Sequence, residues 1–276
     1  MWNLIKAQNY QLKRDNGIIY IYLLGALYIG AFFFDMVKEH SLAEITGSQM
    51  AVSNGLICPI VAGILVPLLT SRIAGWDFND KTLNYELLAG HSRAKVFWSR
   101  VIVSFVWCLV TVLVIFFVPM LIFGCINGWG IKAELGGSLL RYGLALFPLF
   151  RFVCECILLT VIMRNCYMTM IIAFVLYEFS WVFAEMQALL TEIKLTTHFA
   201  STNVTRLLEF GKQKFAYIDG EDVTVYETAM ESSFILGTIG VSILVGGACL
   251  FIAYHYFKKG ADYGCKNCEE YLSEYY

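Results

Sequence analysis

The chain has 276 residues, of which 58% are hydrophobic and only 15% are charged, and its mean hydropathy is +0.64. An ordinary soluble domain is about 45–50% apolar and about 25% charged, so one soluble core cannot hide this much apolar surface. The composition also excludes disordered, collagen-like and disulfide-stapled chains, and a net charge of −2 leaves no footprint for nucleic acid. A multi-span membrane protein is the class that fits.

Residues 1–16 are predicted to form an amphipathic helix that lies along the membrane surface before the first span. Its apolar residues gather on one side: Met1, Leu4, Ile5 and Leu12. Trp2 is a suitable anchor at the interface between lipid and water. The alternative for this segment is a frayed terminus. The first span is expected to be retained, because the sequence before and within it lacks a small-x-small cleavage site.

Six apolar stretches reach, or nearly reach, the length of about 20 residues that a membrane-spanning helix needs. In chain order they are Ile18–Phe34, Met50–Leu69, Val101–Phe123, Leu139–Met163, Tyr167–Ala184 and Phe234–Phe257. Only three residues separate the fourth and fifth stretches, which predicts a tight helical hairpin. The predicted fold class is therefore an all-α integral membrane protein, a single six-span domain over residues 1–276.

The distribution of Lys and Arg predicts that both termini are cytoplasmic. With this orientation the inner segments hold twelve of these residues and the outer segments hold seven, while Arg151 falls within a span. Basic residues concentrate on the cytoplasmic side of membrane proteins. The chain is accordingly expected to be a multi-pass protein of the cell membrane, with the bilayer as its solvent.

The segment between the second and third spans, residues 70–99, has an organised pattern. Asn79 or Asp80 is a suitable cap for a short helix, and Gly90 fits the position at which that helix must stop. Ser92 can then cap the helix that leads into the third span. The pattern predicts a helix, a glycine break and a second helix at the membrane surface. A solvated loop without a partner is the alternative.

This segment resembles the loop after the second span in ABC-2-type transporter permeases. The resemblance rests on an acid followed by Lys81-Thr82-Leu83, on Leu87 and Leu88, and on Gly90-x-Ser-Arg93 before an apolar run. The order of elements along the chain is also similar to that family, from the N-terminal helix through the six spans to a long outer segment. The likeness is greatest to small permeases for antimicrobial-peptide immunity and antibiotic export.

The resemblance implies that a coupling helix around Asp80–Ala89 contacts a separate ATP-binding subunit and passes its movement to the spans. The residues implied for this contact are Asp80, Thr82, Leu83, Glu86, Leu87, Gly90 and Arg93, with Arg164 in a second, smaller contact. ATP and Mg would be bound by that partner, with no cofactor in this chain. The sequence agrees in having no G-x-x-x-x-G-K-[ST] phosphate loop and no catalytic motif, so the chain is not expected to be an enzyme.

The outer loop, residues 185–233, is predicted to carry helical turns followed by a small β-hairpin. Apolar residues recur at helical spacing from Met186 to Ile193, and the segment Phe215–Val225 alternates on both sides of Asp219-Gly220. An Asp-Gly step between alternating segments is typical of a two-residue hairpin turn. Such a loop could form a lid over a pathway or a cap with only a packing role, and both alternatives stay open.

Three charged residues lie deep within the predicted spans. Arg151 and Glu155 are four residues apart and can lie on one helical face, while Glu178 lies in the fifth span. Each costs about 2.5–3.5 kcal/mol to insert, so each is expected to face protein or water. Arg151 and Glu155 are expected to satisfy each other, and all three are candidates for a translocation pathway.

Ala26 and Gly30 form a small-xxx-small step in the first span, which favours close helix packing. In ABC-2 permeases the first and fifth spans commonly build the interface between two permease chains, so the resemblance implies a dimer, of identical or paired chains, packed at these residues. The function expected is export of an amphipathic or hydrophobic substrate. The alternatives are a membrane enzyme built on the three charged residues, and a secondary transporter, which usually shows internal repeats.

Overall fold

A computed structural model describes residues 1–39, 44–79, 86–87, 89–190, 199–210, 213–218 and 221–260. The helices are α1 (Trp2–Arg14), α2 (Asn16–Glu39), α3 (Gly47–Asn79), α5 (Arg93–Ile126), α6 (Leu135–Met163), α7 (Cys166–Leu190), α8 (Ala200–Leu208) and α9 (Ser232–Gly260). The strands are β1 (Gln213–Ile218) and β2 (Glu221–Tyr226), which pair antiparallel.

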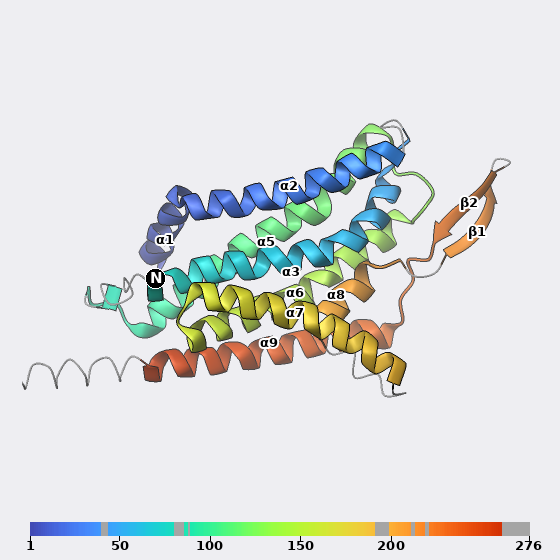
Figure 1. Cartoon of the computed structure of the whole chain (residues 1–276). Coiled ribbons are helices and arrows are strands. Elements are labelled where there is room, and N and C mark those ends of the chain that lie inside the picture. Colours follow the sequence, from blue (N-terminus) through green and yellow to red (C-terminus); the bar gives the residue numbers. More distant parts are fainter. Residues whose placement is uncertain are drawn as a thin grey trace, which may run out of the picture.

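The six long helices run alongside one another in alternating directions (Figure 1). Helix α1 lies across one end of this bundle, where α2 begins and α9 finishes, and we call this the terminal end. The β1–β2 hairpin projects from the opposite end, which we call the hairpin end (Figure 1). The start of α2 and the last described turn of α9 therefore lie at the same end of the bundle.

Six helices of the described residues are long and apolar enough to cross a membrane. They are the six predicted spans, so the predicted helical membrane fold is confirmed at this level. Helix α3 is the most buried of them: 72% of the residues in its most apolar 18-residue stretch are buried, against 17% in the corresponding stretches of α2 and α9. The bundle is therefore centred on α3, while α2 and α9 turn apolar faces outward.

Two of the helices continue far into segments that were predicted to be loops. The segment at residues 70–99 was expected to be a surface loop from its first residue, but α3 continues to Asn79. It does so because Ile73 and Ala74 are buried and because the charge of Arg72 is paired with Asp15. Helix α7 likewise continues to Leu190, through the first residues of the predicted outer loop at 185–233.

The predicted hairpin is present at the hairpin end. Ile218 pairs with Glu221, which leaves two residues, Asp219 and Gly220, for the connection. Between α7 and the hairpin, α8 packs against α3, α6 and α7. Its approach to α3 requires glycine, because a Cβ atom at Gly55 would overlap the carbonyl oxygen of Leu208. The outer segment is thus partly buried within the bundle.

One arginine links several segments at the hairpin end. Arg141, near the start of α6, donates to the carbonyl oxygens of Leu207, Glu209, Glu227, Thr228 and Ala229 over 2.9–3.3 Å. These carbonyls belong to the end of α8 and to the segment before α9, where backbone acceptors have no helical partner. The charge of Arg141 therefore fixes the outer segment to the bundle.

Candidate functional site

The terminal end contains a buried arginine shared by two carboxylates. Arg100, in the second turn of α5, has a side chain only 4% exposed. Its Nη2 donates to Asp77 Oδ2 at 2.8 Å and to Glu86 Oε2 at 2.9 Å. A buried charge is tolerated when it is paired and hydrogen-bonded. This ion cluster joins α3, α5 and the segment that carries Glu86.

The segment that carries Glu86 ends in a defined helix cap. Gly90 N–H donates to the Leu87 carbonyl at 3.0 Å and His91 N–H donates to the Glu86 carbonyl at 3.4 Å. These two bonds and a φ of +83° at Gly90 form a Schellman cap, so the predicted helix stop at Gly90 is confirmed. Ser92 occupies the N-cap position of α5 without a side-chain capping bond. The other residues of the predicted coupling helix, Asp80, Thr82 and Leu83, lie outside the described residues.

The environment of Glu86 shifts its proton affinity. Burial raises the pKa of Glu86 above its usual value of 4.5, although the charge of Arg100 acts in the opposite direction. Gln8 of α1, itself buried, lies beside this carboxylate and also lowers its pKa, but its amide does not reach full hydrogen-bond geometry. Residues of three elements, α1, α3 and α5, therefore influence the pKa of Glu86.

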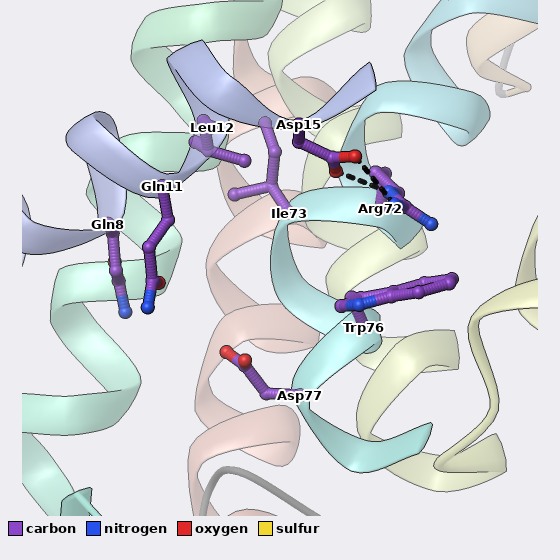
Figure 2. A pocket seen from close by; sticks show the side chains of 8 residues that line it. All are labelled: Gln8, Gln11, Leu12, Asp15, Arg72, Ile73, Trp76 and Asp77. Atoms are coloured by element: carbon purple, nitrogen blue, oxygen red, sulfur yellow. Dashed lines mark hydrogen bonds and ion pairs between the residues drawn. The ribbon is translucent and has the colours of Figure 1, made fainter. Parts of the chain in front are cut away.

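Helix α1 docks onto α3 through a second ion pair. Arg72 Nε and Nη2 donate to the two carboxylate oxygens of Asp15, both at 2.6 Å, as Figure 2 shows. The Arg72 guanidinium also lies 3.4 Å from the centre of the Trp76 ring. The bidentate pairing lowers the pKa of Asp15 below its usual value. A charged bidentate pair fixes geometry as well as adding energy.

A cavity of about 280 Å³ lies beside this pair, between α1 and α3. Figure 2 shows Gln8 and Gln11 pointing from α1 into the same space that Asp77 faces from α3. Trp107 of α5 donates to Asn9 of α1 at 2.8 Å. The predicted helix over the first residues is present as α1. Its residues Leu4 and Leu12 are buried within the protein, and the buried Gln8 between them gives the inner face of α1 a polar centre.

The turn between α6 and α7 lies next to the end of α3. Arg164 adopts a left-handed conformation with φ of 50° and ends α6, and its side chain is exposed. Asn165 caps α7 by accepting from the backbone of Tyr167 and Met168. Asn79 Oδ1 accepts from the Cys166 N–H at 3.1 Å. The turn around Arg164, which was predicted to form the second contact, is therefore bonded to α3. Helix α3 leads into the segment that was predicted to form the first contact.

Arg93, another of the predicted coupling residues, connects two helices at the terminal end. It is the first residue of α5, and its Nη1 donates to the carbonyl oxygen of Lys258 in α9 at 3.1 Å. Glu86, Gly90, Arg93 and Arg164 therefore all lie at the terminal end.

The charged residues within the spans do not form one group. Arg151 Nε donates to Glu155 Oε1 at 2.6 Å, as their spacing predicted. Both line a cavity of about 540 Å³ between α6, α7 and the first turn of α8, which we call the α7 cavity. Glu178 is not among its lining residues. It faces α3 instead, because a Cβ atom at Gly63 would lie 3.0 Å from Glu178 Oε1.

Ala26 and Gly30, the predicted dimer-packing residues, lie on the outward face of α2. Both are exposed, and a Cβ atom at Gly30 would meet nothing within 4 Å. Neither residue therefore contributes to packing within the described part of this chain. Their surface is open to lipid or to a second chain.

Sequence reasoning missed the residues that organise the terminal end. Arg100, Asp77, Asp15 and Arg72 were not among the residues predicted to form a site. No local pattern marks them, because Arg72 and Asp15 are 57 residues apart in the sequence. A signal did exist for Gln8, a polar residue at helical spacing between Leu4 and Leu12. Comparisons with protein-family models and with curated proteins found no match to this chain.

Proposed function

We propose that this protein is the membrane subunit of an ATP-driven transporter of the ABC-2 type. Two permease chains enclose the path, and separate subunits bind and hydrolyse ATP below the terminal end. This places both termini and the capped segment around Glu86 on the cytoplasmic side of the cell membrane. The substrate is an amphipathic or hydrophobic molecule that is exported, such as an antimicrobial peptide or antibiotic.

The observation that carries the proposal is the connection between the surface segment and the spans. The Glu86 carboxylate and the Asp77 carboxylate bind one nitrogen of Arg100. A push on the segment that ends at Gly90 would therefore reach α3 and α5 through charged hydrogen bonds. Subunits that convert ATP binding into movement need such a stiff connection, because a flexible loop would absorb the displacement.

Three further features support the proposal. The exposed residues Ala89, Gly90 and His91 provide a surface for a partner at the tip of this segment. The exposed turn at Arg164 is held beside the end of α3 through Asn79. Helix α1 is fixed to the same helix by Asp15 and Arg72. The two contacts implied by the resemblance would thus act on neighbouring elements.

The test is gentle detergent purification of the tagged chain from its native host, followed by mass spectrometry. We expect a soluble ATPase in stoichiometric amount, and we expect its loss when residues 82–87 are scrambled. The matched control scrambles residues 213–218 of β1 at the hairpin end, which should leave the ATPase bound. Reproducible purification without an ATPase would overturn the proposal and would favour a membrane enzyme or a secondary transporter.

A further inference from the structure

The α7 cavity is open toward the outside of the bundle and closed toward its centre. Its floor includes Ala173 and Tyr177, which are 1% and 5% exposed. Its rim includes Phe179 and Phe183, which are 67% and 59% exposed. Because α7 is long and apolar enough to cross a membrane, this rim faces lipid or a second chain. A ligand of this cavity would enter sideways, from within the membrane.

The cavity wall is mostly apolar. Of its two charged side chains, Glu155 is more exposed than Arg151. Arg151 and Glu155 are paired, but the arginine side chain is 10% exposed and the glutamate side chain is 30% exposed. A carboxylate has about four acceptor sites, and the bond from Arg151 Nε uses one of them. The charge that the cavity offers to a ligand is therefore mainly the negative charge of Glu155.

The floor also holds a polar atom without a described partner. The Tyr177 hydroxyl is buried, and among the described residues it forms no hydrogen bond. A buried hydroxyl without a partner is unfavourable by about 1–3 kcal/mol. Tyr177 lines the cavity, so a ligand or a water molecule that reached the hydroxyl from there would relieve this cost. The floor of the cavity thus contains a polar group whose hydrogen-bonding capacity is not used by the described residues.

From this geometry we infer that the α7 cavity binds a cationic amphiphile. Its ammonium group would lie at Glu155, and its apolar body would lie along Leu176, Phe179 and Phe183. Aromatic ring faces also attract cations. An anionic head group would meet the exposed carboxylate and be disfavoured. The inference deepens the proposed function, on which it rests for the ligand's role as substrate, but the binding itself requires no ATPase.

The test uses the full chain in phosphatidylcholine nanodiscs and radiolabelled dodecyltrimethylammonium as the probe. We expect saturable binding that unlabelled probe displaces and that neutral dodecyl maltoside and anionic dodecyl sulfate do not. Glu155→Gln should weaken binding about tenfold or more, which is the loss of one charged contact. The matched control is Glu134→Gln, which removes an exposed carboxylate just before α6 and should leave binding unchanged.

Two further variants separate ligand binding from folding. Ala173→Phe fills the floor and leaves the ion pair in place, so it should abolish binding. If that variant melts earlier than the wild type, Phe179→Ala with Phe183→Ala removes only exposed rim rings and should weaken binding by itself. Absent saturation, unchanged binding in Glu155→Gln, or equal displacement by dodecyl sulfate would each overturn the inference.

The outcome is independent of the test of the proposed function. Saturable binding by a chain that purifies without an ATPase would refute the transporter proposal and leave the cavity assignment intact. An ATPase partner for a chain that does not bind the probe would refute the cavity assignment and leave the transporter proposal intact.

Discussion

Arg100 Nη2 lies 2.9 Å from Glu86 Oε2, and this contact joins the surface segment ending at Gly90 to the second turn of α5. The same nitrogen lies 2.8 Å from Asp77 Oδ2. One cation therefore holds two carboxylates that approach from different parts of the terminal end. The proposed coupling depends on this connection.

Replacing the shared arginine should destabilise the terminal end. Arg100→Gln leaves Asp77 and Glu86 close together without their cation, and removing one partner of a buried pair costs about 3–5 kcal/mol. Since both acids are about a quarter exposed, solvent screens their charges, and we expect a loss at or just below the lower limit of that range, roughly 2–3 kcal/mol. Thermal or denaturant unfolding in detergent measures it.

The control for this change is Lys95→Gln, which alters an exposed residue five positions earlier in α5. It should alter stability by less than about 0.5 kcal/mol. The double variant Arg100→Gln with Glu86→Gln should recover part of the loss, because it removes one of the two unpaired charges. Equal stabilities for Arg100→Gln and Lys95→Gln would show that the cluster does not hold the terminal end.

Glu86 should make the protein less stable as the pH rises. Burial raises its pKa above the usual 4.5, so between these two values the folded state binds more protons than the unfolded state. Stability then falls as the pH rises through that interval. Glu86→Gln should remove this part of the pH dependence in melting curves recorded between about pH 4 and about pH 7.

Asp15 should contribute a pH dependence of the opposite sign. The hydrogen bonds from Arg72 lower its pKa below the usual 3.8, so its stabilisation is complete above that value and is lost as the pH falls through the folded pKa. Asp15→Asn should therefore leave the Glu86 interval unchanged and reduce the loss in stronger acid. If the wild type and Asp15→Asn lost stability identically as the pH fell, the assignment of this pH dependence to Asp15 would be contradicted.

Adding one methyl group at the contact between α3 and α8 should be harmful. The Cβ of Gly55→Ala would overlap a backbone carbonyl of Leu208, and backbone cannot rotate away as a side chain does. Overpacking of this kind costs about 1–3 kcal/mol. The matched change is Gly247→Ala in α9, where the added Cβ would meet nothing within 4 Å. A similar melting midpoint for both variants would place α8 elsewhere.

The proposed dimer can be tested on the outward face of α2. Gly30→Leu adds bulk where the chain itself has nothing within 4 Å, so the monomer fold should be unaffected. If α2 packs against a second chain, the dissociation constant should rise about tenfold or more, or roughly 1.4 kcal/mol. Energy transfer between labelled chains in nanodiscs measures it, with Gly247→Leu as the control on α9. Unchanged association would exclude Gly30 from the interface.

Features that depend on a few neighbouring residues could be predicted from the sequence. The spans follow from apolar stretches of membrane length, the hairpin follows from an Asp-Gly step between alternating residues, and the helix stop follows from Gly90. The pair of Arg151 and Glu155 was also predictable, because four residues separate them on one helix.

Features that depend on distant parts of the chain could not be predicted. The continuation of α3 to Asn79 was missed because Ser71 and Arg72 look like the start of a polar loop. Arg72 joins the bundle because it pairs with Asp15, which is 57 residues earlier in the sequence. The pairing of Arg100 with two carboxylates and the hydrogen bonds from Arg141 to five carbonyl oxygens likewise depend on how the helices pack. The spacing of residues in the sequence does not encode that packing. The separation of Glu178 from Arg151 has the same origin.

The proposed coupling is tested most directly by site-specific crosslinking from His91, which is exposed at the tip of the capped segment. A photoreactive amino acid placed there, in the native host, should crosslink to a soluble ATPase, and the same group at Ile131, exposed at the hairpin end, should not. Arg100→Gln should leave the crosslink in place but reduce transport per ATP hydrolysed. Crosslinks from His91 only to lipid or to this chain itself would contradict the proposal.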